Sequence, residues 1–483
     1  MTEPTPQEYP AATNAFTTLR DKIYIHELPS YANKIFYSLG FLALTALLML
    51  VATGIVLAFM GPTWWLTSTW GIHFRSIHSW SVQAFMAILF CHVLVGLSTS
   101  AFKPPRRMVW VFGAIIFCLA LIQTEFGYAL RGDFSSQYRI ISGADFWNGA
   151  YLGWLINPEN LTLDFATHVA IIPLTILGLF VLHYLLEHTY GIAKPYRKDI
   201  AYKVVPANHI PMYVRGGALV VLILAMAWLF PSPFVAPETI SGVAQTDPQL
   251  VAQTLLQEFD HTSGTATYLD SIDPYTYDTR QVYVVVPYEQ VATLETNNLG
   301  STTDAWTTFQ TESSDQQQSD IAAAHAYFDA TTTPITATSS AQQQSFANNP
   351  VITIINSLVP TAQSGLYESI INHESPNTNY TYNIRFLTDL GVLDTEAAAV
   401  HITTAEWGMA REETGSLTKL PPGAWWFAPI GILNSTVLAG DNNGDRDAAA
   451  ILGLVMLVFI LFPYIPYLNR VPEYLPFAKW IWK

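Results

Sequence analysis

Four histidines occupy two long apolar segments of this chain, and their spacing suggests a shared chemical role. His78 and His92 are 14 residues apart, and His168 and His183 are 15 residues apart. Such spacings make about four turns of an α-helix and roughly 21 Å of rise, so each pair lies on one helix face at two depths. Two neutral imidazoles on opposite sides of a planar macrocycle give six-coordinate iron suited to electron transfer. We predict that the four histidines ligate two haems. The alternative, polar residues that line a channel, gives no reason for the matched spacing.

Four glycines repeat this spacing in two other apolar segments. Gly40 and Gly54 are 14 residues apart, and so are Gly113 and Gly127. A porphyrin edge that lies flat against a helix needs positions without a Cβ, although glycine also serves close packing of membrane helices. Glycine pairs in step with histidine pairs favour two stacked cofactors between four helices.

The composition is that of a membrane protein. Of the 483 residues, 51% are hydrophobic and 12% are charged, which is too apolar for an average soluble protein. Apolar runs long enough to span a bilayer occur at about 35–60, 79–99, 108–128, 166–188, 214–232 and 448–466. We therefore expect an all-α membrane protein with a four-helix haem-binding bundle and two further transmembrane helices.

The basic residues predict the orientation of these helices. They cluster near the N-terminus, in KPPRR (103–107) and in KPYRKDIAYK (194–203), which lie on one side of the membrane if six helices alternate. The positive-inside rule makes this side cytoplasmic. The predicted parts are a cytoplasmic surface arm (1–34), the four-helix core (35–210) and a fifth helix (211–232). They are followed by an extracytoplasmic insertion (233–420) and by a last part with a loop, the sixth helix and a tail (421–483).

The insertion, residues 233–420, is rich in Thr, Ser, Gln, Asn and Asp, and it explains most of the net charge of −15. Its segments VYVVVPYEQVATL, NPVITIINSL and YNIRFLTDLGVL resemble short strands between polar linkers, so we expect a small, mostly β insertion. Three Asn-X-Ser/Thr triplets begin at Asn160, Asn379 and Asn434 on the predicted outer side. Together with the insertion they suggest an archaeal, acidic cell surface.

The two cysteines, Cys91 and Cys118, lie inside predicted transmembrane helices. This placement excludes a disulfide framework and a thiolate metal cluster. Any iron–sulfur centre must therefore belong to another subunit.

A family resemblance rests on motifs in the first 215 residues. These motifs are KIFYSLG and VATG, RSIHSW and FCHVL, FKPPRRMVWVFG and EFGYAL, and THVAIIP and LHYLLEH. They resemble the haem core of the cytochrome b and cytochrome b6 family, the quinol-oxidising subunit of bc1- and b6f-type complexes. The spacing of 15 residues between His168 and His183, and the proline five residues after His168, resemble the b6 branch of the family more than the mitochondrial branch.

The resemblance implies which histidines share a haem. His78 and His168 would ligate a b-type haem near the outer face, and His92 and His183 a second one near the cytoplasm. The helix directions agree, because both histidine helices run inward in the predicted topology. Arg75 matches a family arginine that can pair with a haem propionate.

Ser38 stands where chloroplast-type proteins have the cysteine that attaches an extra haem. The resemblance therefore implies that this third haem is absent.

The resemblance also implies an inner and an outer quinone site. His188 and Arg215 match inner-site positions, where an imidazole can donate a proton to reduced quinone. At the outer site the family usually has Pro-Glu-Trp-Tyr, but this chain has PPGAWW, with Gly423 in place of the glutamate. Asp133 or Glu125 could accept the quinol proton instead.

The implied mechanism is quinol oxidation near the outer face. One electron passes to a Rieske-type iron–sulfur protein, and the other crosses through both haems to reduce quinone near the cytoplasm. The implied partners are that protein, a further acceptor such as a cytochrome or terminal oxidase subunits, and membrane lipid. We expect the chain to belong to a multi-subunit complex, which could be dimeric, and we expect no nucleic-acid partner.

Two other functions are weighed against this one. A dihaem membrane anchor of a dehydrogenase or hydrogenase would also use paired histidines. That function does not explain the 14-residue spacing of the glycines or the PPRR motif. A cell-surface display or receptor protein would explain the insertion but not the four histidines.

Overall fold

The computed structural model describes residues 27–195, 202–267, 277–299, 304–329, 346–374, 381–400, 402, 422–441, 444–474 and 481–482. In this part of the chain, six helices are long and apolar enough to cross a membrane. They confirm the predicted all-α membrane fold. The spans are α2 (Leu39–Thr67), α3 (Thr69–Ser98), α4 (Arg107–Ala129), α6 (Leu161–Ala166) continued by η3 and α7 (Ile172–Tyr190), α8 (Ile210–Leu229) and α22 (Gly444–Leu461).

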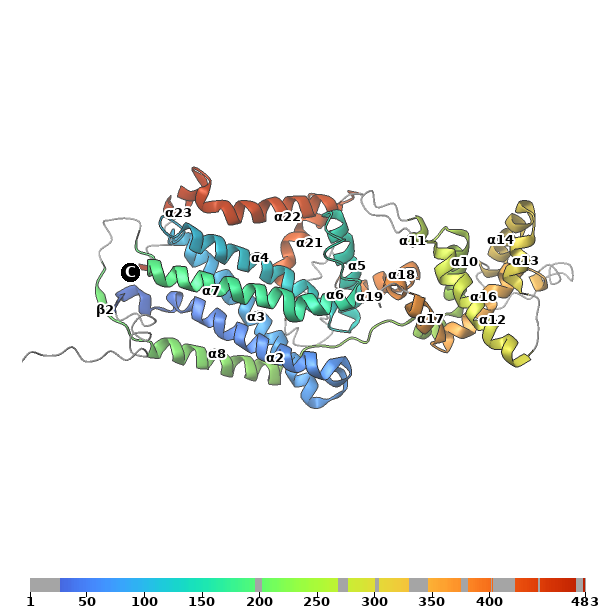
Figure 1. Cartoon of the computed structure of the whole chain (residues 1–483), viewed down its shortest axis with the longest axis horizontal. Coiled ribbons are helices and arrows are strands. Elements are labelled where there is room, and N and C mark those ends of the chain that lie inside the picture. The colour runs from blue at the N-terminus through green and yellow to red at the C-terminus, as the bar shows by residue number, and fades with distance from the viewer. Residues whose placement is uncertain are drawn as a thin grey trace, which may run out of the picture.

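The transmembrane helices form one bundle (Figure 1). Helix α2 packs along α3, α4 packs along α7, and α8 lies against α2 and α3. Helix α22 lies against α4 and α5 (Phe134–Gly149) on another side. The centre is filled by apolar side chains that include Ala46, Met86 and Ala120. The histidine helices α3 and α7 and the glycine helices α2 and α4 are thus the four helices of the core.

Helix α3 begins about ten residues before the predicted span. Its first turns carry Arg75 and Ser76, whose polar side chains lower the local hydropathy. Both side chains are buried, and they bond the segment after α8: Arg75 donates to the Ser232 carbonyl at 2.9 Å, and the Ser76 hydroxyl accepts from the Ser232 amide at 2.9 Å. Polar groups satisfied in this way can sit in a helix that hydropathy alone would shorten.

The span that carries His168 contains a wide turn. Residues Thr167–Ile171 form the π-helical turn η3 between α6 and α7. In a regular α-helix, 14 residues end about 40° short of four full turns, whereas 15 end about 60° beyond them. Because a π turn takes one more residue than an α turn, it absorbs the fifteenth residue. His168 and His183 can therefore share a face, as His78 and His92 do with a spacing of 14.

The described part of the N-terminal arm is attached to the end of the bundle. Strand β1 (Glu27–Pro29) pairs antiparallel with β2 (Val204–Pro206), and the buried Tyr31 packs against Ile481 and Trp482. Residues 1–26 of the predicted surface arm, and residues 196–201 of the second basic cluster, lie outside the described residues.

The predicted β structure of the insertion is wrong, because the three segments are helical. They form the π turn η4 (Gln281–Val285) with α12 (Val286–Leu299), then α16 (Pro350–Gln363), and finally α18 (Thr381–Asp389) with α19 (Val392–Ala399). A continuous apolar run fits a buried helix as well as a buried strand. In α16, Asn349 caps the first turn by accepting from the Ile352 amide at 3.0 Å, and Pro350 occupies the first helical position.

The insertion shares a core with the membrane bundle. Phe134 and Ile140 of α5 belong to the same buried apolar cluster as Ile240, Leu390 and Leu393 of the insertion. Figure 1 shows α5 between the bundle and the insertion, with α18 and α19 next to it. The remaining described helices of the insertion are α9 (Ile240–Thr246), α10 (Pro248–Asp260), α11 (Gly264–Thr267), α13 (Ala305–Thr311), α14 (Ser314–Phe328) and α17 (Leu366–Glu374).

Two titratable groups predict that the insertion loses stability as pH rises. Burial, and then the charge of Asp389, raises the pKa of Glu258, which is fully buried. Burial alone would lower the pKa of His325, but hydrogen bonds to Asp260 (2.6 Å) and Asp329 (3.0 Å) raise it overall. A raised folded pKa means that the folded state holds the proton more tightly than the unfolded state. This stabilisation is complete below the unfolded pKa and disappears as pH rises through the folded one.

We expect hydrogen exchange in α10 to become faster as pH is raised from acidic to alkaline values, beyond the intrinsic change in exchange chemistry. Each unit by which folding shifts a pKa is worth about 1.4 kcal/mol. In Glu258→Gln this acceleration should be smaller, because the variant removes one of the two groups. Equal pH dependence in the wild type and the variant would show that Glu258 does not contribute.

Candidate functional site

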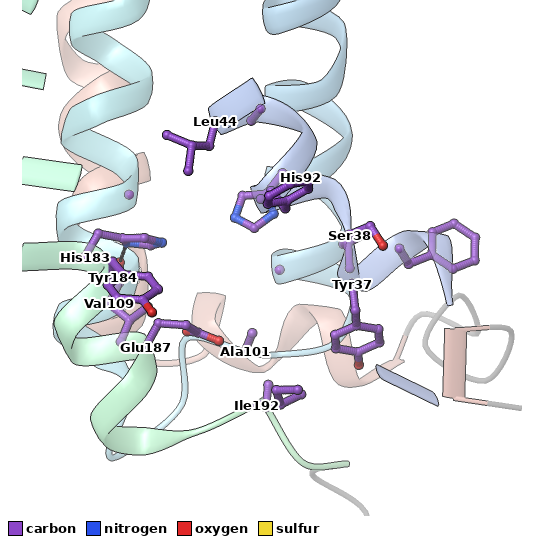
Figure 2. A pocket seen from close by; sticks show the side chains of 18 of the residues that line it. Tyr37, Ser38, Leu44, His92, Ala101, Val109, His183, Tyr184, Glu187 and Ile192 are labelled. Carbon is purple, nitrogen blue, oxygen red and sulfur yellow. Dashed lines mark hydrogen bonds between the residues drawn. The ribbon is translucent and has the colours of Figure 1, made fainter. Parts of the chain in front are cut away.

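The structure brings the four histidines together in two pairs, one ring from α3 and one from the α7 span in each. The rings of His78 and His168 have their centroids 6.4 Å apart and are inclined by 67°. His92 and His183 line one cavity, and Figure 2 shows their rings on different helices with the cavity between them. Each pair can therefore approach one planar group from opposite sides.

Hydrogen bonds fix the tautomer of three histidine rings. The Thr53 hydroxyl donates to the Met49 carbonyl at 2.7 Å, so its oxygen accepts from Nδ1–H of His78 at 2.9 Å. A carbonyl oxygen can only accept, so Nδ1 of His168 donates to the Gln123 carbonyl at 3.0 Å. Nδ1 of His183 likewise donates to the Val109 carbonyl at 2.9 Å. The lone pair then lies on Nε2, the arrangement common in metal-binding histidines.

Each of the four glycines lies against one histidine ring. A Cβ added at Gly40 would lie 3.4 Å from Cε1 of His92, and one at Gly54 would lie 3.3 Å from Cε1 of His78. The corresponding distances are 3.0 Å between Gly113 and His183 and 2.7 Å between Gly127 and His168. Helix α2 thus faces the histidines of α3, and α4 faces those of α7. The glycines give the imidazole rings room beside the neighbouring helix, a contact that spacing alone did not specify.

The cavity at His92 and His183 has a volume of about 610 Å³ and extends to the end of the bundle. Arg215 lines it, and its guanidinium donates to the Ser38 hydroxyl at 2.6 Å and to the Asn33 carbonyl at 3.1 Å. Tyr37 also lines it, and burial raises the pKa of this phenol to about 12. The mouth of the cavity therefore combines a fixed cation with a protonated phenol.

Arg106 and Glu187 form a second polar contact at this mouth, where Arg106 also donates to the carbonyls of Gly191 and Ala101. His188 is the predicted inner-site residue that the structure does not bring into this group. It follows Glu187 on α7, packs near Tyr184 with ring centroids 6.3 Å apart, and is not part of the described cavity lining. Of the two predicted inner-site residues, only Arg215 lines the cavity.

Arg75 contacts the segment after α8 instead of standing free beside a ligand. Its guanidinium donates to the carbonyls of Ser232 (2.9 Å) and Pro233 (3.1 Å) and lies 5.4 Å from the ring centroid of Phe234. These contacts fix where the chain leaves the bundle for the insertion. The contact between Arg75 and a haem propionate stays a prediction.

The segment predicted as the outer quinol loop returns into the bundle after the insertion. Gln83 of α3 donates to the Pro422 carbonyl at 2.7 Å and accepts from the Trp425 indole at 3.0 Å. The indole of Trp426 donates to the Thr124 hydroxyl at 2.9 Å. The segment continues as η7 (Trp425–Phe427) and α21 (Ala428–Ser435). It therefore packs between α3 and α4, beside the part of α4 that carries Glu125.

The two predicted proton acceptors occupy different environments. Asp133 is fully buried; its carboxylate accepts from the Ser136 amide at 3.0 Å and pairs with Arg131 at 2.7 Å. These are the contacts of a cap at the start of α5. Glu125 retains 13% side-chain exposure and lies 3.7 Å from the Arg139 guanidinium, which stacks over Tyr128 and Phe427. Glu125 follows Thr124, whose hydroxyl accepts from the Trp426 indole, so it lies on the stretch of α4 that the segment 422–427 contacts.

Sequence reasoning did not identify Thr53 and Gln123. The Thr53 hydroxyl bonds the His78 ring, and Gln123 bonds His168 through its backbone carbonyl and its side-chain amide. Both are polar residues inside apolar spans, and both lie near the glycines, Thr53 immediately before Gly54 and Gln123 four residues before Gly127. Polar residues within a membrane span are usually functional. Their position could therefore have marked Thr53 and Gln123 as candidate site residues.

Comparisons with known proteins match the bundle. A family profile described as cytochrome b (N-terminal)/b6/petB matches residues 83–239. Cytochrome b6 of Heliobacterium modesticaldum is 31% identical over 192 residues, which cover 35% of this chain and 90% of that protein. Cytochrome b6 of Mastigocladus laminosus is 28% identical over 204 residues, covering 37% of this chain and 92% of that protein.

Two further similarities are more limited. The cytochrome b subunit of the cytochrome bc1 complex of Corynebacterium diphtheriae is 35% identical over 124 residues, or 23% of each chain. A solved structure titled hyperthermophilic respiratory Complex III is 18% identical with a TM-score of 0.38, covering 73% of this chain and 97% of its own. The match to almost the whole length of cytochrome b6 decides the assignment: the chain belongs to the cytochrome b and cytochrome b6 family.

Proposed function

We propose that this chain is the dihaem cytochrome b subunit of a quinol-oxidising respiratory complex. The observation that carries the proposal is the repeated unit of one histidine, one facing glycine and one Nδ1 acceptor. It occurs at Gly54 and His78, at Gly127 and His168, and at Gly113 and His183. Membership of the family supports the same function at a coarser level.

The histidines would hold the cofactors by pairs. In the proposal, His78 and His168 ligate one b-type haem, and His92 and His183 ligate the other. When bound, the two haems would supply one-electron carriers at two depths of the membrane. The chain contributes tautomers that keep Nε2 available, glycines that keep the rings in place, and a cavity of about 610 Å³ at the inner pair.

The proposed orientation places the N-terminus and the inner cavity on the cytoplasmic side. The basic residues Lys103, Arg106 and Arg215 all lie at that end of the bundle, as the positive-inside rule requires. The insertion then lies outside the cell, next to α5 and to the segment 422–427. Quinol would be oxidised between these elements, with Glu125 as the first proton acceptor.

Quinone reduction is proposed at the mouth of the inner cavity. The Arg215 guanidinium can hold a reduced quinone oxygen, and the protonated Tyr37 phenol, whose oxygen accepts from the Trp482 indole at 3.1 Å, lines the same cavity. His188, which lies outside the cavity lining, would act only through a rearrangement of the end of α7. The proposed partners remain a Rieske-type iron–sulfur protein and a further electron acceptor in a multi-subunit complex.

A reduced-minus-oxidised spectrum with a redox titration of the purified chain tests the haem assignment. We expect two bis-imidazole haem components in the wild type, loss of one in His168→Leu and loss of the other in His183→Leu. His261→Asn is a matched control, because His261 is exposed in the insertion and its left-handed backbone (φ 62°) accepts asparagine. Absence of any bis-imidazole signal in the wild type would refute the proposal.

A second measurement separates quinol oxidation from the function of a dihaem anchor. We expect quinol to reduce the outer haem fully only when an oxidised iron–sulfur protein accepts the other electron. Reduction by quinol at the same rate without that partner would favour the anchor instead.

A further inference from the structure

A buried carboxylate at the start of the fourth span has no role in the function described so far. Asp164 lies on α6, four residues before His168, and its side chain is completely buried. Among the described residues, neither of its carboxylate oxygens has a hydrogen-bond donor. A buried ionised carboxylate without donors carries a large free-energy penalty, so this residue needs an explanation.

The neighbour of Asp164 is the carboxylate already placed at the outer site. Helix α4 packs against α6, and Glu125 is close enough to Asp164 for their charges to repel each other. Glu125 itself is partly accessible, with 13% of its side chain exposed, whereas Asp164 has no exposed surface. Helix α5 passes close to Glu125, because a Cβ added at Gly143 would lie 2.8 Å from Oε1 of Glu125.

Two carboxylates in such a site favour a shared proton. Ionising both would place two negative charges together in a poorly solvated place, so one proton is retained between them. A cation faces the pair from α5, where Arg139 lies 3.7 Å from Glu125. The titratable His168 follows Asp164 by four residues on the same span. Glu159, in the segment before α6, is engaged by Arg385 at 2.7 Å. The pair then carries one proton and one negative charge, and the Arg139 cation close to Glu125 compensates that charge.

We propose that Glu125 and Asp164 form a proton-accepting pair that takes the place of the glutamate absent at Gly423. This inference rests on the proposed quinol oxidation. One O–H bond of bound quinol breaks and its proton binds the carboxylate of Glu125, while the proton of the other O–H bond leaves with the electron that the iron–sulfur partner accepts. The proton already held in the pair then resides on Asp164, so the pair becomes neutral. One electron would leave to the iron–sulfur partner and the other to the haem that His78 and His168 would hold, and the proton on the pair is later released outside through Glu125.

The test is the pH profile of quinol oxidation by the purified complex with its iron–sulfur partner. A positioned acid or base contributes about 10²- to 10⁴-fold to a rate. We expect Asp164→Asn and Glu125→Gln each to slow quinol oxidation by about 100-fold or more and to remove the same limb of the pH profile. The double variant should be no slower than the worse single variant, because the two groups act as one unit. The matched control is Glu289→Gln at an exposed position of α12, which should retain the wild-type profile.

A second readout does not depend on turnover. The carbonyl stretching band of a protonated carboxylic acid should be present in the infrared spectrum of the wild type at neutral pH. The part of this band that comes from the pair should be lost in Asp164→Asn and in Asp164→Leu, whereas the part that comes from Glu258 should remain. Intact bis-imidazole spectra in these variants would show that the bundle is folded.

The outcomes separate this inference from the proposed function. If the wild type oxidises quinol and both Asp164 variants keep its rate, its pH profile and the infrared band, the proton-accepting pair is refuted while the function stands. If the wild type binds two haems but never oxidises quinol, the proposed function fails, and the infrared band alone then decides whether the pair holds a proton.

Discussion

Gly127→Ala is expected to abolish the outer haem signal while it leaves the inner signal in place. The added Cβ would lie 2.7 Å from Cε1 of His168 and 3.4 Å from both ring nitrogens. The ring cannot easily retreat, because its Nδ1 donates to the Gln123 carbonyl on the same helix as Gly127. Alanine favours the helix by about 1 kcal/mol over glycine, so the loss should appear in the redox titration and not in the helix content.

The other glycines provide graded controls for this prediction. Gly54→Ala places a Cβ 3.3 Å from the His78 ring, and Gly40→Ala places one 3.4 Å from the His92 ring. A neighbour can adjust to such contacts by a few tenths of an ångström, so we expect shifted midpoint potentials without loss of either signal. An unchanged outer haem in Gly127→Ala would contradict the idea that this glycine maintains the position of His168.

Arg385→Leu is expected to detach the insertion from the bundle. Arg385 on α18 and Glu159 before α6 form an ion pair at 2.7 Å, and their side chains are only 4% and 5% exposed. Removing one member of a buried pair leaves the other charge buried and typically costs about 3–5 kcal/mol. We therefore expect hydrogen exchange in α18 and in the adjoining α5 to accelerate by about two to four powers of ten.

The double variant Glu159→Leu with Arg385→Leu should recover most of that stability, because it leaves neither charge buried. Arg446→Leu is the matched control, since Arg446 pairs with Asp447 on the half-exposed start of α22. It should leave exchange in α18 unchanged. Equal exchange in Arg385→Leu and the wild type would mean that the shared apolar core alone holds the insertion.

The membrane part of the fold could be predicted because lipid leaves few alternatives. Six apolar runs gave six helices, and only their ends differ where polar residues such as Arg75 and Ser76 are bonded within the protein. The fifteen-residue spacing required a π turn that no periodicity rule specifies. The role of this turn, which is to bring His168 and His183 to one face of the span, follows only from the positions of both histidines in the structure.

The insertion was predicted with the wrong secondary structure for a physical reason. Val and Ile favour strands when one face is solvated, but Ile354, Ile355 and Leu358 of α16 are all buried in a helical core. Asn349 and Pro350 form a recognisable helix start that outweighs the β-branched run. The sequence motifs paired His78 with His168 and His92 with His183, and the structure brings the members of each pair near each other. They did not specify which glycine lies against which histidine. They could not reveal Asp164, because its significance depends on α4 lying beside it.

The depth of the two histidine pairs makes the proposed electron path sensitive to membrane voltage. Fourteen helical residues rise about 21 Å, roughly two thirds of a hydrocarbon layer about 30 Å thick. Moving one elementary charge across the full potential is worth about 2.3 kcal/mol per 100 mV, so the step between the pairs is worth about 1.6 kcal/mol per 100 mV. With the cell interior negative, this voltage opposes the inward electron. An energised membrane should therefore keep the electron near His78 and His168, and turnover should slow as the potential builds.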